Sequence, residues 1–120
     1  MSDQEDLAFT LTFTAAAGVA SQPRVELERW RVLETEAEQF LSGFLASSGK
    51  GRCTSPLVEI DFRTMQARTA SGRVYDLVGP PATKAEAALL LLIAAANRDA
   101  HYVRDVTDEL LSWRCNFNLH

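Results

Sequence analysis

The stretch 56–98 constrains the fold of this 120-residue chain more than any other part of the sequence. Residues 57–63 alternate apolar and charged side chains, which is typical of a strand with one buried face. A two-residue turn at 63–64 would bring Ile60 opposite Ala67, so that apolar side chains meet on the same side. We therefore expect this stretch to begin with a β-hairpin.

A second hairpin is expected directly after the first. With 70–72 as a three-residue loop, Ala67 pairs with Tyr75 and the charged side chains stay on the polar face. Gly72 then takes the left-handed position that a type I turn followed by a bulge requires.

A helix is expected over about 83–98. Gly79-Pro80-Pro81 cannot continue a strand, because proline lacks an amide hydrogen, and Thr83 with Glu86 has the spacing of a capping box. Residues 87–97 carry no charge, so the helix has to be covered on more than one side, either as a central core helix or by a dimer partner. At about 15 residues it is shorter than the roughly 20 that a membrane-spanning helix needs.

The first half of the chain predicts further strands. Residues 7–14 alternate large apolar side chains with alanine and threonine, which indicates a strand. The segment 25–46 fits two strands at 25–34 and 39–46, or a helix over 35–47 capped by Thr35. The strands expected on either side favour the first interpretation.

A last strand is expected at 101–106, after the apolar helix. The predicted fold class is therefore α+β: an antiparallel meander of about five to seven strands with the helix packed on it. The tail over 113–120 has large apolar residues without a clear period, and we expect it to dock on the domain or to bind a partner.

The length of the chain predicts a single domain over 1–120. The segment 1–6 is acidic and lacks the basic start and apolar run of a secretory signal, so we expect a flexible N-terminus and a cytoplasmic protein. Cys53 and Cys115 have neither CxxC spacing nor a histidine cluster beside them, so no metal site, disulfide scaffold or cofactor is expected.

The net charge of −4 is distributed unevenly along the chain. Residues 1–46 hold eight acidic and three basic side chains, whereas 47–73 hold two acidic and five basic ones. The whole molecule is therefore not expected to attract nucleic acid. Arginines in the basic part could bind carboxylates or phosphates bidentately, or only protect sheet edges. The candidate partner-binding residues are Arg52, Arg63, Arg68, Arg73, Trp113 and Phe117. The candidate dimer-interface residues are Leu90, Leu91 and Ala94.

No residue pattern predicts catalysis. His101 is flanked by Tyr102 and lies two residues from Asp99, but neighbouring strand residues point to opposite faces and would not converge. The carboxylates between 105 and 109 lack an EF-hand loop, and no nucleophile or phosphate-loop motif is present. We therefore expect a protein without enzymatic activity.

The run from Thr69 to Pro80, with Trp30-Arg31 upstream and residues 105–108 downstream, resembles small bacterial proteins of unassigned activity that occur on prophages and other mobile elements. The resemblance implies a bacterial cytosolic accessory protein. It transfers no functional residue, because structural residues account for every matching position.

Together these features predict a small non-catalytic protein-binding module with a protein partner. The first specific hypothesis is an inhibitor or immunity protein that occludes a basic site on a larger partner. The alternatives are a homodimeric structural or accessory subunit, and a small enzyme or nucleic-acid binder that uses His101 or the hairpin arginines.

Overall fold

The computed structural model describes residues 22–98, 100 and 102–117, with side chains as far as residue 112. It has an α+β fold with one mixed, mostly antiparallel seven-stranded sheet, which confirms the predicted fold class. The strand predicted at 7–14 lies outside the described residues. The elements are β1 (Arg24–Glu34), β2 (Gln39–Leu45), β3 (Gly51–Cys53), β4 (Leu57–Asp61), β5 (Gln66–Thr69), β6 (Val74–Val78), α1 (Lys84–Arg98), β7 (Arg104–Asp105) and α2 (Thr107–Phe117).

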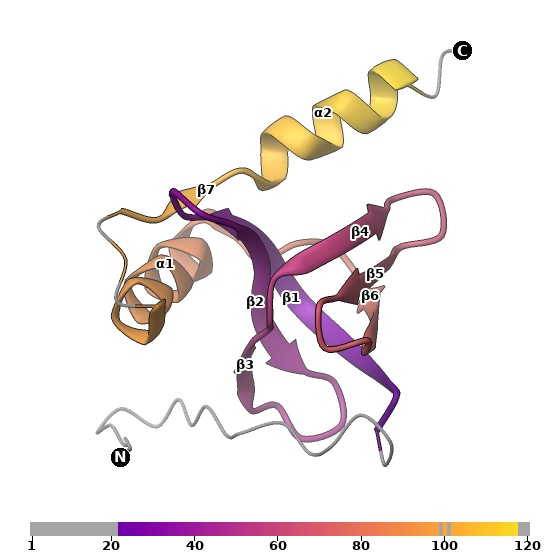
Figure 1. Ribbon diagram of the computed structural model, residues 1–120, viewed down its shortest axis with the longest axis horizontal. Coiled ribbons are helices and arrows are strands. Elements are labelled where there is room, and N and C mark those ends of the chain that lie inside the picture. Colours follow the sequence, from indigo (N-terminus) through magenta and orange to yellow (C-terminus); the bar gives the residue numbers. More distant parts are fainter. Residues whose placement is uncertain (1–21, 99, 101, 118–120) are drawn as a thin grey trace.

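Two antiparallel meanders make up most of the sheet. One contains β1, β2 and β3, the other β4, β5 and β6, and they join through a parallel pairing of β1 with β6. The sheet is therefore not the single meander that was predicted, because the chain crosses over after β3 and returns to β1 on its other side. Strand β7 also pairs with β1, so β1 lies at the centre of the fold (Figure 1).

A bulge in β1 sets which side chains enter the main core. Arg29 has a φ of 47°, and the register with β2 shifts around it. Leu27 and Trp30 therefore lie in the same core cluster as Val32, although the first two are three positions apart. Gly43 on β2 lies against the bulge, where a Cβ would be 3.0 Å from the Trp30 Cα. The two strands approach this closely because residue 43 has no side chain.

Strands β1 and β2 confirm the strands predicted at 25–34 and 39–46, and the alternative helix over 35–47 is wrong. Thr35, which could have capped that helix, instead closes the hairpin. Its Oγ1 accepts hydrogen bonds from the amides of Ala37 at 3.1 Å and Glu38 at 3.2 Å. The same capping chemistry therefore serves a turn between strands.

The two predicted hairpins are present, and their pairing around Ala67 is as expected, although a register shift between Leu57 and Glu59 changes the pairing at the start of β4. Ile60 pairs with Ala67, and Ala67 pairs with Tyr75. Gly72 has a φ of 93° and donates to the Thr69 carbonyl at 2.8 Å. This confirms the left-handed glycine of the second turn.

The first hairpin turn is wider than predicted. The two-residue turn at 63–64 is wrong, because the chain turns over 62–65 with Met65 at a φ of 56°. The side chain of Asp61 accepts a hydrogen bond from the Arg63 amide at 2.9 Å, which stabilises the longer turn.

Helix α1 confirms the helix predicted at 83–98, including its capping box. Thr83 donates its amide to the Glu86 carboxylate at 3.1 Å, and the Glu86 amide donates to Thr83 Oγ1 at 3.3 Å. Leu90 and Ala94 pack against side chains of β1 and β2. Among the described residues, no helix is long and apolar enough to cross a membrane.

The C-terminal part holds a helix that the sequence analysis missed. The strand predicted at 101–106 shortens to β7, and α2 occupies most of the expected tail. Thr107 Oγ1 accepts a hydrogen bond from the Val32 amide at 2.7 Å, while Leu110 and Leu111 pack against the main core. Figure 1 shows α2 running away from the sheet after this anchored first turn.

Buried Arg31 ties β1 to the segments around both helices. Its Nε lies 2.8 Å from Asp105 and its Nη2 3.5 Å from Asp108, while Nη1 donates to the Ala82 carbonyl at 3.0 Å. Burial raises the pKa of Asp105, but hydrogen bonds from Arg31 and the Thr107 backbone outweigh it and hold the pKa below its usual value. Asp105 is therefore ionised in the folded protein at neutral pH.

We predict that Asp105→Asn lowers the free energy of unfolding at neutral pH by about 2 kcal/mol, because Arg31 then stays buried without its nearest carboxylate. A carboxyl group with a depressed folded-state pKa stabilises the protein above its unfolded pKa of about 4, and this contribution is lost as pH falls through the folded value. Urea unfolding at several pH values should therefore show the gap between the proteins shrinking below about pH 4.

The matched control is Asp108→Asn, since this carboxylate lies farther from Arg31 and is mostly exposed. It should cost less than about 0.5 kcal/mol. An Asp105→Asn gap that stays constant down to about pH 3 would contradict the assigned role of the Arg31–Asp105 pair.

Candidate functional site

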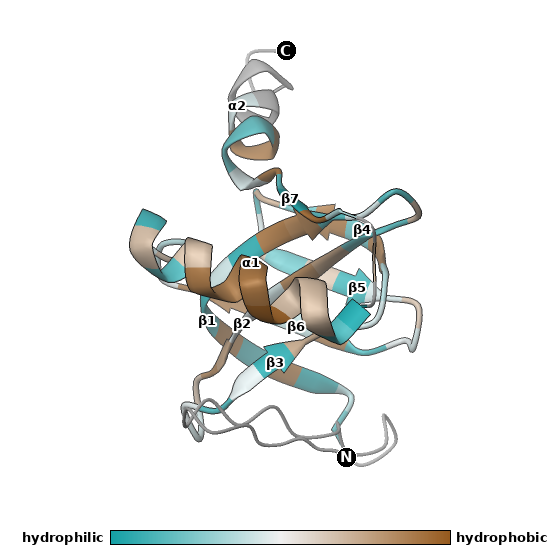
Figure 2. Cartoon of the chain, turned by 90° about the vertical axis from the view of Figure 1, so that its left-hand side faces the viewer, coloured by the Kyte–Doolittle hydropathy of each residue, from teal (hydrophilic) through white to brown (hydrophobic). Residues whose placement is uncertain are grey.

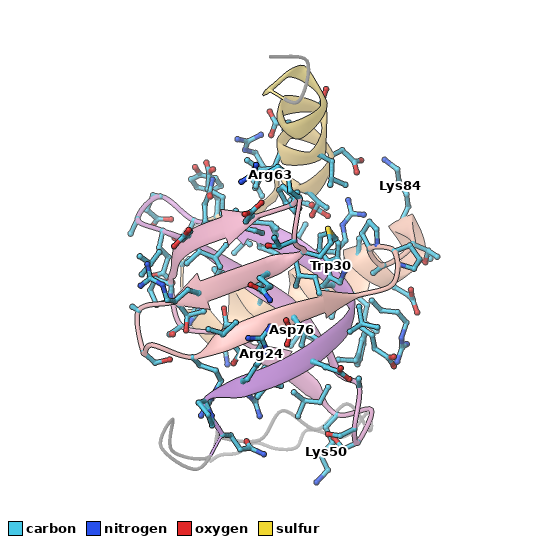
Figure 3. The ribbon with its side chains drawn as sticks, turned by 90° about the vertical axis from the view of Figure 1, so that its right-hand side faces the viewer. Arg24, Trp30, Lys50, Arg63, Asp76 and Lys84 are labelled. Carbon is cyan, nitrogen blue, oxygen red and sulfur yellow. The ribbon has the colours of Figure 1, made fainter. Side chains whose placement is uncertain are left out.

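The exposed hairpin arginines each face an acidic neighbour. Arg63 Nε lies 3.5 Å from an Asp61 carboxylate oxygen, and Arg68 Nη2 lies 3.0 Å from a Glu59 oxygen. Figure 3 shows Arg63 and Lys50 at opposite ends of the molecule. The basic side chains of the central segment therefore do not gather on one surface.

The same pairing recurs elsewhere on the described surface. Arg24 and Asp76, side by side in Figure 3, form a bidentate pair with distances of 2.7 and 2.8 Å. Further pairs join Arg29 with Glu86, Lys84 with Asp108, and Arg104 with Glu109. Such pairs contribute little stability in water, but they leave few charges for electrostatic docking of a partner.

The other two candidate arginines, Arg52 and Arg73, are buried, with 5% and 3% of their surfaces exposed. Arg73 Nε donates to the Gln22 carbonyl at 2.8 Å, which ties the start of β6 to the residues before β1. Neither side chain can belong to an exposed basic patch, so the sequence analysis gave them the wrong environment.

Arg52 lies on edge strand β3 in an unusual environment. Its Nη1 donates to the Tyr75 hydroxyl at 3.2 Å, whereas its buried Nε has no hydrogen-bond partner. No ion pair joins Arg52 to a carboxylate of the described residues. A buried guanidinium with so few partners costs free energy that the surrounding packing has to offset.

The described residues offer little for covalent or metal chemistry. Burial raises the pKa of the Cys53 thiol, although a contact with Ser42 Oγ at 3.6 Å partly opposes the shift. The neutral thiol is a poor nucleophile. Among the residues with described side chains, no group of three histidine, cysteine or acidic residues could hold a metal ion. Asp99 and His101 lie outside the described residues.

Two of the five exposed large hydrophobic residues in the described part of the chain lie on one side of α1. Leu89 is 42% exposed and Leu92 is 72% exposed. With three exposed alanines they form what we call the outward face of α1: Ala85, Ala88, Leu89, Leu92 and Ala96. Figure 2 shows this side of the helix toward the viewer, hydrophobic along its middle and hydrophilic at its ends.

This geometry corrects two expectations about the helix. It is not a central core helix, because the described residues cover only one of its sides. The predicted dimer-interface residues also lie on the covered side: Leu90 and Ala94 are fully buried, and Leu91 packs partly against the sheet. The residues available to a partner are Leu89 and Leu92, which the sequence analysis missed. Residues 87–96 are all alanine, leucine or isoleucine, so their type gives little signal for which side of the helix faces inward.

The remaining candidates, Trp113 and Phe117, belong to α2. The structure describes their backbone but not their side chains. The tail over 113–120, for which the sequence predicts no regular element, is therefore helical as far as residue 117. Tyr102, between α1 and β7, is 48% exposed.

We predict that Arg52→Met raises the free energy of unfolding by about 1 kcal/mol, because it removes a buried charge that has no carboxylate partner among the described residues and keeps most of the side-chain volume. The control is Arg68→Met on the exposed surface, which should change stability by less than about 0.5 kcal/mol. Chemical denaturation measures both. A loss of more than about 1 kcal/mol in Arg52→Met would show that the guanidinium makes a net stabilising interaction.

Comparison with known proteins places this chain in no family. No protein-family model matches it, and neither a curated protein nor a solved structure does. The geometry of the described residues therefore carries the functional argument.

Proposed function

We propose that this chain is a non-catalytic protein-binding module and that it contacts its partner through the outward face of α1. The observation that carries the proposal is the 72% exposure of Leu92 within a helix face that has no polar side chain. A single exposed leucine is ordinary, but a continuous apolar helix face is typical of a surface that another protein covers.

The energetics of such a contact are favourable. Covering one leucine side chain contributes roughly 1.5–3 kcal/mol relative to leaving it in water. The outward face holds two leucines and three alanines, so a partner that covers it removes apolar surface without having to desolvate a charge.

The helix is also held firmly before a partner arrives. Leu90 and Ala94 are fully buried against side chains of β1 and β2. At its end, Arg98 lies over the Phe40 ring at 3.8 Å and forms an ion pair with Glu38 at 3.3 Å. A preformed contact surface lowers the entropy cost of binding.

The second candidate is an inhibitor or immunity protein that occludes a basic site on a larger partner, and the net charge of −4 favours it. However, Glu34, Glu38 and Glu59 already lie within ion-pair distance of arginines of their own chain. An acidic contact would weaken steeply with salt, whereas an apolar contact through α1 would change little. Salt dependence therefore separates the two candidates.

We predict that the double substitution Leu89→Gln/Leu92→Gln reduces partner capture at least tenfold, because amide side chains in the contact leave polar groups to be desolvated. The tagged chain is purified from an extract of its native host after nuclease treatment, at about 0.3 M salt, where surface charges are well screened. The measured quantity is stoichiometric protein, including untagged copies of the chain.

The matched control is Val58→Gln on β4, an exposed apolar residue away from α1, which should retain the partner. Circular dichroism and thermal unfolding check that all variants fold. Equal capture by the wild-type chain and the α1 variant would contradict the proposed surface. Capture that is lost at about 0.3 M salt in every protein would favour the acidic inhibitor.

A further inference from the structure

We infer that the partner of the outward face of α1 is a second copy of this chain, with the two α1 helices packed antiparallel about a two-fold axis. The inference rests on the proposed function, since it names the partner of that same surface. Four exposed residues on one side of the helix carry it: Ala85, Leu89, Leu92 and Ala96.

The order of these residues is the same from either end of the helix. Their spacing of four, three and four is that of a seam between packed helices. A two-fold interface requires that residue i meets residue j and that j meets i. An antiparallel pair meets this condition, because Ala85 lies opposite the partner's Ala96 and Leu89 lies opposite the partner's Leu92. The seam is therefore complementary to itself.

The side chains also suit close packing of two helices. Packed helices lie about 8–10 Å apart, depending on the residues between them. The leucines of both copies would meet around the two-fold axis, and Ala88 beside them leaves space for interdigitation. The alanines at both ends carry no bulk that would hold the helices apart.

Charge favours the antiparallel orientation. The outward face carries no charge, so no side chain is repelled by its own copy. Lys84 stands at the start of the helix with 90% of its side chain exposed, and in an antiparallel pair it lies near the carbonyl end of the partner helix. A parallel pair would instead bring the two lysines together and align the helix dipoles.

The size of the contact predicts a reversible dimer. One pair of short helices buries less than the ~1,000 Å² of total surface that stable interfaces exceed. We therefore expect a dissociation constant on the order of micromolar rather than a permanent assembly.

Sedimentation velocity of the purified full chain tests the assembly. From about 2 to 200 μM, a range that brackets micromolar affinity, the wild-type protein should pass from monomer to dimer. Leu89→Gln/Leu92→Gln should weaken association at least tenfold, while Val58→Gln should behave as wild type.

Cysteine cross-linking tests the orientation in a chain whose Cys53 and Cys115 are replaced by alanine. Positions 85 and 96 lie about 16 Å apart along the helix, too far for a disulfide within one chain. Ala85→Cys/Ala96→Cys should therefore form disulfide-linked dimers on mild oxidation, and Ala85→Cys alone should not. A parallel pair would cross-link the single variant as well, because residue 85 would then lie opposite the partner's residue 85.

A chain that stays monomeric at all concentrations overturns the inference, as does a dimer that Leu89→Gln/Leu92→Gln leaves unchanged. If the purified chain is monomeric but the α1 variant loses a different protein partner, the proposed function stands and only the second-copy assignment fails. If association and capture are both insensitive to the α1 variant, both proposals fail.

Discussion

The bulge at Arg29 in β1 is the constraint on which most of this fold depends. Strand β1 pairs with β2, β6 and β7, and it contributes side chains to clusters on both of its faces. The bulge keeps Leu27 and Trp30 in the main core, while Leu33 faces α1. Since a shift of one residue reverses every side chain of a strand, the bulge places Leu27 on the same face as Trp30 and Val32. The close approach of Gly43 then fixes where β2 can pair.

The charged side chains of the described part work mainly within the chain. Arg31 uses its buried guanidinium to connect β1 with the Asp105 carboxylate and the Ala82 carbonyl, so one residue joins segments distant in the sequence. On the surface, exposed arginines and glutamates neutralise one another across neighbouring elements. The outward face of α1 takes part in none of these ion pairs and stays exposed. Both proposals therefore place the partner there.

Local rules predicted the parts of the fold that depend on local spacing. The two hairpins follow from alternation and from Gly72, and the helix start follows from the capping box of Thr83 and Glu86. The spacing of three between Leu27 and Trp30 resembled a helix because a bulge interrupts the strand period. Helix α2 was missed because its start is anchored by a hydrogen bond between Thr107 and Val32, which are 75 positions apart. The burial of Arg52 and Arg73 also depends on pairing between distant strands. Their charge and their place beside loops predicted a surface role, because neither shows that pairing.

Caps, turns and alternation act between near neighbours, so the residues alone specify a capped helix that follows two hairpins and carries no charge over 87–97. Which side of that helix the other described residues leave exposed depends on how it packs on the sheet. Residues 87–96 are all alanine, leucine or isoleucine, so residue type alone does not separate Leu90 and Ala94 from Leu89 and Leu92. Packing on β1 and β2 makes the two sides of the helix different, because the sheet can cover only one of them. The candidate binding surface is thus a product of packing and not of local sequence pattern.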